Sequence, residues 1–582
     1  MIEPVVALLN APAAAKVRGL LLSLQKRPRI LALIAGILIG LAQPPFGFLP
    51  GLFGYALLLF ALERDMGVKP WRTTFLIGWM AGSAYFFVSC FWVAQAFLVD
   101  AQTYGWMAPF ATALLAAGIG LFWGLFAMAY QRLRTDRGFR FLLFAVLFSL
   151  FEITRGTIMS GFPWDPSGST WRAGSAMSQM AAFVGVYGLG LITVAIFASP
   201  AVVRPGRGVR GWWPVLVAAV LWIGCFVVGE VRLATTHIGS TGYTVRVVQP
   251  NVGQRAKWTV GALESLLGAY VTLSQAPPQA GHPVPSLIVW PEGALPSMLE
   301  DLLSEDSWTA PVLTSFLQDK QALIMGVSRT DQDAEGRTIY RNSMVAMHQD
   351  GPHITIDGFY DKYKLVPFGE FTPFQDILNP LGMKALTHFD DSFTPGPRTR
   401  PVQFYTIPKF LPLICYEGIF PGLDMDRYHS SNDPLRPSWI LNISNDAWFA
   451  PLAGSTENLN LPPVLADILR FILSTGPRQH LNLASYRAIE EGLPMIRSTP
   501  TGISVLVDPL GRIVAGTRID LNQKDSVDLV IPGRAERTVY STFRTSPLVL
   551  DVIFLLILVT FDTLVLVIRK KPIRSLFRRG HN

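Results

Sequence analysis

Charged residues are scarce in this sequence. Asp, Glu, Lys and Arg make up 15% of its 582 residues, whereas hydrophobic residues make up 50%. The apolar residues gather in blocks of roughly 18 or more with almost no charge, the length that crosses about 30 Å of hydrocarbon, and this excludes an ordinary soluble protein. The chain also lacks metal-ligand spacing and a Gly-rich phosphate loop, so we predict no metal and no cofactor.

Cysteine is also scarce, with three residues in the whole chain. Cys90 and Cys225 fall inside apolar blocks, and Cys415 stands alone in a more polar region, so no disulfide framework is expected. A solitary thiol is vulnerable in an oxidising compartment, which suggests a chemical role for Cys415. The alternative is a small buried hydrophobic residue, the usual role of a free cysteine.

The apolar blocks predict a polytopic helical bundle of about eight membrane spans. We divide the chain into a bundle over residues 1–238, an outward-facing domain over 239–545, and a last span with a basic tail over 546–582. The expected spans are about Ile30–Gln43, Gly51–Leu62, Phe75–Val99, Met107–Tyr130, Phe141–Ile153, Met180–Val202, Trp213–Val228 and Pro547–Ile568.

Basic residues lie beside these spans rather than in one patch. The formal net charge of +8 would suit a nucleic-acid partner, but every second connection between spans is basic, as in 132–140 and 204–210. The alternate connections, such as Asp100–Trp106, are nearly free of Lys and Arg. Positive residues favour the cytoplasmic side, so both termini are expected in the cytoplasm and the polar domain outside. We predict a multi-pass membrane protein without a nucleic-acid partner.

The polar region has the pattern of an α/β domain. Short β-branched runs alternate with Gly, Pro and Asp clusters and with helical stretches. The expected strands are Tyr243–Gln249, Ser286–Trp290, Ala322–Val327, Phe410–Cys415 and Trp439–Ile443. Glu292 and Cys415 follow two of these strands, and Lys362 lies in the segment Phe359–Glu370. Because side chains at the ends of neighbouring strands converge in one crevice, the three groups are expected to meet.

A carboxylate, an amine and a thiol form a consistent catalytic set. Attack requires a thiolate, so Cys415 needs a base and a nearby cation, which Glu292 and Lys362 would supply. The backbone N–H of Tyr416 would help to stabilise the oxyanion. Taken singly, each residue has a plainer interpretation: a solvated loop glutamate, a surface lysine beside Lys364, and a packing cysteine.

The residues around these three positions resemble the nitrilase superfamily, which has a Glu-Lys-Cys triad on an αββα sandwich. More narrowly, the whole chain resembles the apolipoprotein N-acyltransferases of the bacterial inner membrane. The matching segments are Trp290–Pro296, Tyr360–Glu370, Ile414–Glu417, Asn442–Phe449, Gln479-His480 and Arg487–Glu490, with Glu152, Arg155 and Gly161–Trp164 in the membrane part.

The resemblance implies a role for each matching residue. Glu292 would be the general base, Lys362 the oxyanion-stabilising cation and Cys415 the nucleophile. Among the supporting residues, Glu370 would position the lysine, and Tyr416 and Glu417 flank the nucleophile. Trp258 would lie on a loop near the lipid entry or act as an interfacial anchor.

The resemblance also implies a ping-pong reaction. An acyl chain would pass from a phospholipid, typically phosphatidylethanolamine, to Cys415 as a thioester. It would then pass to the N-terminal α-amino group of a diacylated apolipoprotein, on the periplasmic side of the inner membrane. Two alternatives remain: a membrane-tethered nitrilase-type amidase or hydrolase, and a non-catalytic lipid-binding membrane protein.

The chain departs from the family pattern in two places. Residues 450–475 replace a short link, and within them Leu459–Leu473 predicts either an interfacial helix near the substrate entrance or a helix packed on the domain. Pro500 stands where an Asn is expected. In the membrane part, Glu152 and Arg155 are three residues apart, so they share a helix face and can pair, either in a functional role or as an ion pair that only locks helices.

Overall fold

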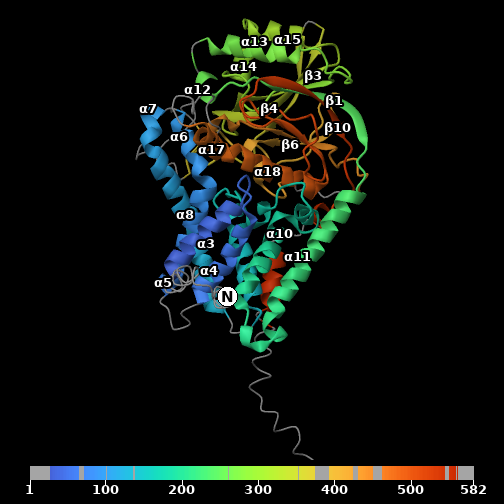
Figure 1. The fold of residues 1–582 in the computed structure, drawn as a ribbon. Helices are drawn as coiled ribbons and strands as arrows, with labels where there is room; N and C mark the ends of the chain where they lie inside the picture. Colours follow the sequence, from blue (N-terminus) through green and yellow to red (C-terminus); the bar gives the residue numbers. More distant parts are fainter. Residues whose placement is uncertain are drawn as a thin grey trace, which may run out of the picture.

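In the computed structural model, a helical bundle carries an α/β domain on one end (Figure 1). The structure describes residues 27–63, 71–99, 101–134, 138–257, 259, 261–351, 353–373, 392–423, 430–449, 462–543, 549–558 and 560.

Helices occupy each of the eight expected spans. In chain order they are α3 (Pro28–Ala42), η2 (Leu49–Phe53) with α4 (Gly54–Glu63), α5 (Trp71–Cys90) with α6 (Ala94–Leu98), α8 (Ala108–Leu133), α9 (Arg140–Thr157), α10 (Ala181–Ala198), α11 (Val209–Thr235) and a last helix over Val549–Leu558.

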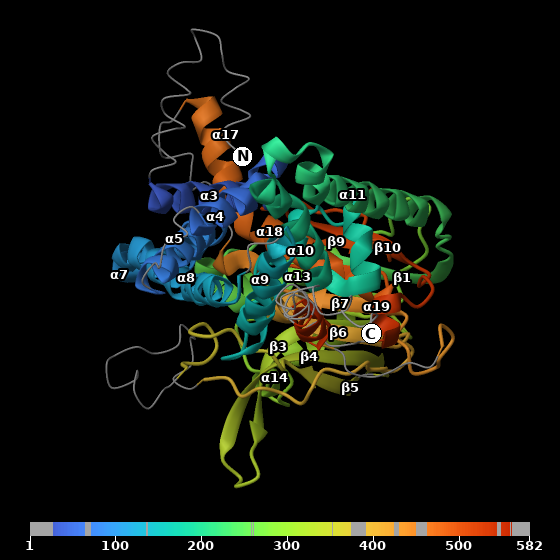
Figure 2. The same ribbon diagram turned by 90° about the horizontal axis from the view of Figure 1, so that it is seen from below.

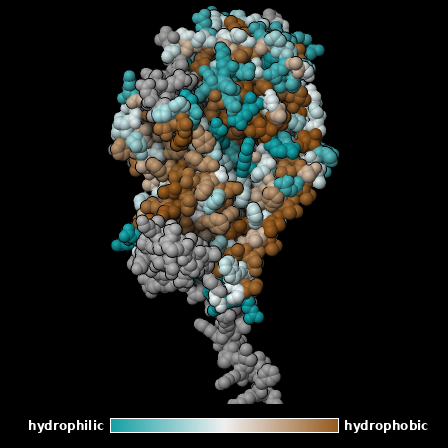
Figure 3. All heavy atoms as spheres, viewed as in Figure 1, coloured by the Kyte–Doolittle hydropathy of each residue, from teal (hydrophilic) through white to brown (hydrophobic). Residues whose placement is uncertain are grey.

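Four helical stretches in the described part of the chain are long and apolar enough to cross a membrane: Trp71–Leu98, Ala101–Leu133, Met177–Val202 and Val209–Thr235. The helices Pro28–Ala42, Leu49–Glu63 and Val549–Leu558 are apolar but shorter. Hydrophobic side chains cover the visible face of the bundle and of α11, whereas hydrophilic side chains gather on the α/β domain (Figure 3).

Small residues let α5 and α8 approach closely. A Cβ at Gly78 would lie 2.3 Å from the backbone oxygen of Trp123, and one at Gly82 would lie 3.0 Å from the Cα of Gly120. Helices in a membrane gain little from the hydrophobic effect between them, so close backbone contact is what holds such a pair together. α3 packs on the other side of α5.

The α/β domain contains two sheets. The first has the order β10-β1-β2-β3-β4-β5, with β1, β2 and β3 parallel, and the second has the order β6-β7-β8-β9, with β6, β7 and β8 parallel. The strands are β1 (Ser240–Gln249), β2 (Leu287–Val289), β3 (Ala322–Gln332), β4 (Thr338–Asp350), β5 (His353–Asp361), β6 (Phe410–Ile414), β7 (Trp439–Ile443), β8 (Met495–Ser498), β9 (Val505–Val507) and β10 (Asp525–Pro532).

Alternation along the strands places one core between the sheets and one outside each sheet. Val245 and Val247 of β1 pack against the second sheet, while Val248 packs under α13 (Ala262–Ser274) and α15 (Thr309–Phe316). On the far side, α18 (Thr475–Glu491) covers the second sheet. The layers are therefore helix, sheet, sheet and helix, and the expected fold class of a membrane bundle with an αββα domain is confirmed.

The helix α18 is shared by both parts of the molecule. One face packs Leu481, Ala484 and Ala488 on the second sheet. The other face binds the bundle, where Asn482 Nδ2 donates to the carbonyl of Ser169 at 3.0 Å and Glu490 accepts from the backbone N–H of Val186 at 2.8 Å. Bundle and domain are thus continuous through α18 (Figures 1 and 2).

Candidate active site

The structure brings Glu292, Lys362 and Cys415 together between the two sheets. Glu292 follows β2, Lys362 follows β5, and Cys415 directly follows β6. Lys362 Nζ donates to Glu292 Oε1 at 3.0 Å, and both of these charged groups act electrostatically on the thiol of Cys415. All three side chains are buried, with at most 8% exposed.

Three groups fix the Glu292 carboxylate. Oε1 accepts from Lys362 and from Asn342 Nδ2 at 2.8 Å, and Oε2 accepts from the backbone N–H of Asn445 at 2.7 Å. Burial would raise the pKa of Glu292, but Lys362 and the hydrogen bonds outweigh it and hold the pKa below its usual value. Glu292 is therefore ionised at neutral pH and can accept a proton.

Lys362 lies between two carboxylates. Its ammonium also donates to Glu370 Oε1 at 3.0 Å, and Glu370 Oε2 accepts from the backbone N–H of Val366 at 2.8 Å. Burial would lower the pKa of Lys362, but Glu292 and Glu370 raise it well above its usual value. The lysine therefore carries a permanent positive charge beside the thiol.

The Cys415 thiol is protonated in this state. Burial and the neighbouring Glu292 charge raise its pKa to about 12. The residue has a φ of 51°, in the left-handed region, which costs about 1–3 kcal/mol for a non-glycine residue and is typical of functional turns. A protonated thiol beside an ionised carboxylate is the ground state of a general-base mechanism.

Glu417 holds the nucleophile turn against the lysine segment. Oε2 accepts from the backbone N–H of Ile414 at 2.7 Å. Oε1 accepts from the Tyr360 hydroxyl at 2.9 Å and from the backbone N–H groups of Tyr363 and Lys364 at 2.8 and 3.1 Å. The fully buried carboxylate therefore links the segments that carry Cys415 and Lys362.

A buried polar group behind Cys415 supports the turn from α18. His480 Nε2 lies 3.1 Å from the carbonyl oxygen of Cys415, and this contact requires a proton on Nε2. Nδ1 lies 3.1 Å from both Arg497 NH2 and Asp446 Oδ1, and burial and Arg497 lower the pKa of His480. Arg497 also binds both oxygens of Asp446. His480 and Asp446 lie in segments that match the family, but the sequence indicated neither this role nor the participation of Arg497.

The other side of the nucleophile turn touches the bundle. The Tyr416 hydroxyl donates to the carbonyl of Gly161 at 2.9 Å. No direct hydrogen bond or ion pair is described between Glu152 and Arg155. Glu152 accepts instead from the backbone N–H and hydroxyl of Ser167, and Arg155 donates to the carbonyls of Phe162 and Trp164. Arg155 thereby shapes the loop that Tyr416 contacts.

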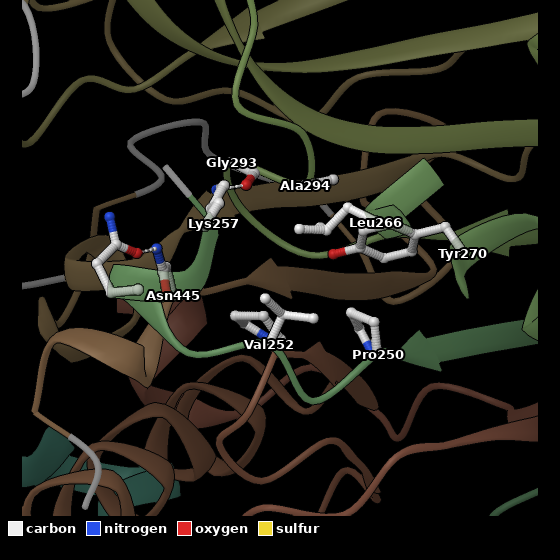
Figure 4. A pocket seen from close by; sticks show the side chains of 10 residues that line it. Pro250, Val252, Lys257, Leu266, Tyr270, Gly293, Ala294 and Asn445 are labelled. Carbon is white, nitrogen blue, oxygen red and sulfur yellow. Dashed lines mark hydrogen bonds between the residues drawn. The ribbon is translucent and has the colours of Figure 1, made fainter. Parts of the chain in front are cut away.

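A small pocket lies beside Glu292. Its lining includes Gly293, which follows Glu292, and Asn445, whose backbone N–H binds Glu292; Lys257 donates its Nζ to the carbonyl of Gly293 (Figure 4). Burial lowers the pKa of Lys257 to about 8. The residues that line the pocket are Pro250, Val252, Gln254, Lys257, Leu266, Tyr270, Gly293, Ala294, Asn445 and Pro500. Trp258 lies outside the described residues. Within them, no three His, Cys, Asp or Glu side chains converge as a metal site.

Two sequence families match the chain. Residues 35–199 match the apolipoprotein N-acyltransferase N-terminal domain, and residues 244–450 and 464–525 match carbon-nitrogen hydrolase. The second match omits 451–463, inside the expected insertion. Fold and site together define a carbon-nitrogen hydrolase domain joined to a membrane bundle.

The relatives narrow this class. The apolipoprotein N-acyltransferase of Caulobacter vibrioides is 43% identical over 513 residues, which cover 88% of this chain and 90% of the relative. That of Rhodopseudomonas palustris is 33% identical over 566 residues, covering 95% and 97%. The chain belongs to the apolipoprotein N-acyltransferase family and is an enzyme of that kind.

Proposed function

We propose that the enzyme moves an acyl chain from a phospholipid to the N-terminal α-amino group of a diacylated apolipoprotein, through a thioester on Cys415. One observation carries the proposal: the buried thiol of Cys415 lies within the electrostatic reach of a carboxylate that is itself paired with a buried ammonium. We assign the roles of general base to Glu292, oxyanion stabiliser to Lys362 and nucleophile to Cys415.

In the first half-reaction, Glu292 takes the thiol proton while the sulfur attacks the ester carbonyl of the phospholipid. Negative charge develops on the carbonyl oxygen, and Lys362 with the backbone N–H of Tyr416 stabilises it. When the intermediate collapses, the bond to the glycerol oxygen breaks. Glu292 returns the proton to that oxygen, and a lysophospholipid leaves.

In the second half-reaction, the α-amino group of the acceptor attacks the thioester carbonyl. Glu292 takes a proton from the amine, an amide forms, and the sulfur leaves and regains the proton. Glu370 keeps Lys362 in place through both halves, and Glu417 keeps the turn of Cys415 in register with the lysine segment. Trp258 is proposed to contact lipid, as the family resemblance implies.

We further propose that the enzyme resides in the bacterial inner membrane with its α/β domain on the periplasmic side. The alternation of basic and neutral connections along the bundle supports this orientation. Phosphatidylethanolamine is the proposed donor. Both substrates are lipids, so a site attached directly to a bundle can receive their chains without extracting them into water.

The test is to trap the intermediate. Purified enzyme is incubated with phosphatidylethanolamine vesicles, and the Cys415 peptide is examined by mass spectrometry; an acyl adduct is expected in the wild type and not in Cys415→Ala. Adding a diacylated lipopeptide should then remove the adduct and yield a triacylated product. Free fatty acid with an unchanged lipopeptide would instead establish a hydrolase, and the absence of any adduct would overturn the mechanism.

A further inference from the structure

The helix α17 (Pro463–Leu473) carries an apolar face that is largely exposed. Val464 is 70% exposed, Leu465 51%, Ile468 49% and Phe471 38%. Val464 and Leu465 lie four and three positions before Ile468, and Phe471 lies three positions after it, so the four share one side of the helix. Ala466, on another side, is the buried residue of the helix.

The opposite side of α17 is charged. Arg470 NH1 pairs with Asp467 Oδ1 at 3.2 Å, and both side chains are largely exposed. Two positions separate Ile468 from Arg470, which places them on opposite faces at 3.6 residues per turn. An exposed helix with one apolar and one charged face is typical of segments that lie in a membrane interface.

The position of α17 connects this apolar face to the membrane part. The ring of Phe471 packs edge-on against Phe46, with centroids 6.1 Å apart, and Phe46 lies in the turn between α3 and η2. α17 sits at the height of α18, between the sheets and the bundle (Figure 1). Seen along the long axis of the molecule, it appears lengthwise and projects sideways next to α3 (Figure 2).

We propose that α17 lies in the lipid–water interface of the bilayer, with Val464, Leu465 and Ile468 among the acyl chains, Phe471 against Phe46 of the bundle, and Arg470 toward water. Its axis runs across the bundle (Figure 2), as an in-plane helix requires, and its Phe471 ring contacts Phe46 of a bundle that is itself in the membrane. Exposing this apolar face to water would cost free energy. The bilayer that surrounds the bundle can cover the face, so no further protein partner is needed.

This placement has a consequence for the site. α17 leads through Ser474 directly into α18, which contributes His480 to the carbonyl of Cys415. The lipid surface therefore supports the element that holds the nucleophile turn. The proposal depends on the bundle being in a membrane and not on the identity of the acyl acceptor.

The test measures lipid exposure at two positions of α17. The starting protein is the full-length chain with Cys415→Ser, in which the two remaining cysteines, Cys90 and Cys225, are buried and should not react with the label. A single new cysteine, Ile468→Cys or Arg470→Cys, is then introduced and labelled with a nitroxide. The labelled protein is reconstituted into vesicles of phosphatidylcholine and phosphatidylglycerol. Collision of the label with oxygen, which concentrates in lipid, is compared with collision with a water-soluble nickel chelate.

Two further positions calibrate the result. Ile223 on the exposed side of α11 serves as the lipid reference, and Glu335 in the β3–β4 turn serves as the water reference. We expect oxygen to exceed the chelate several-fold at 468, as at 223, and the reverse at 470, as at 335. A label at 468 that the chelate reaches as easily as at 335 would overturn the proposal. So would a label at 468 that neither reagent reaches, because protein would then cover the face.

Discussion

Replacing Lys362 by Met removes the cation that two buried carboxylates share. Glu292 and Glu370 each lie 3.0 Å from its ammonium, and the lysine side chain is 1% exposed. Breaking a buried ion pair from one side costs roughly 3–5 kcal/mol, because the remaining charge stays buried without compensation. We expect a loss of stability of this size at neutral pH, together with a loss of acyl-enzyme formation of about 10²–10³-fold.

The pH dependence gives the prediction its sign. In the wild type the pKa of Glu292 is below its ordinary value of 4.5. Glu292 therefore stabilises the folded state above that value, and this contribution is lost as the pH falls through the folded pKa. Without Lys362, only the hydrogen bonds from Asn342 and the Asn445 N–H oppose burial, and we expect the pKa to rise above 4.5. The same carboxylate then destabilises the folded state as the pH rises, so the deficit of the variant grows from pH 5 to pH 8.

The assay is thermal unfolding of the detergent-solubilised full chain, followed by tryptophan fluorescence at pH 5 and pH 8. Lys524→Met, which removes an exposed lysine of the same domain, controls for the loss of one positive charge. A difference in Tm between wild type and Lys362→Met that is equal at both pH values would refute the reasoning. A Tm deficit no larger than that of Lys524→Met would do the same.

Three further predictions concern the support of the triad. A Cβ at position 326 would lie 2.5 Å from the Cα of Glu292, so Gly326→Ala should lower the free energy of unfolding by about 1–3 kcal/mol and slow acylation. Gly268 has open space around it, so Gly268→Ala is the control and should do neither. Equal Tm values for the two variants would contradict this prediction. His480→Ala should slow acylation about 5–150-fold with little change in the KM for the phospholipid, because the carbonyl of Cys415 loses its hydrogen bond. His480→Gln keeps an N–H that can donate to this carbonyl, so it should recover part of the rate. Equal rates for the Ala and Gln variants would exclude positioning through that hydrogen bond. Glu417→Gln cannot accept all four hydrogen bonds, so it should lower the Tm and increase hydrogen exchange at Ile414 and Tyr363; unchanged exchange there would disprove the link between the two segments.

Much of the layout could be predicted because it follows from hydrophobic pattern. The apolar blocks of the bundle and the buried strands β1, β2, β6 and β7 are nearly continuous runs, which is the pattern of elements covered on both faces. The ends of those strands then indicated where reactive side chains would meet. The proximity of Glu292, Lys362 and Cys415 agrees with that reasoning, and their chemical roles stay predictions.

The rest could not be predicted because polar residues do not reveal their partners. The hairpin of β4 and β5 is half-polar, so it was missed together with Asn342, which holds Glu292. Arg497 is fully buried although an isolated arginine in a sequence suggests a surface. Glu152 and Arg155 have the spacing of an ion pair, yet nearby backbone groups and a serine hydroxyl offered closer partners than either had for the other.

The two-sided packing of α18 limits how the enzyme can move. Its polar residues look suited to solvent, yet one side of the helix closes a sheet and the other binds backbone groups of the bundle, while His480 holds the carbonyl of Cys415. If the α/β domain rotated relative to the bundle, α18 would have to break its contacts either with the second sheet or with the bundle. The reactive sulfur is accordingly held at one height above the membrane, and each lipid must travel to it.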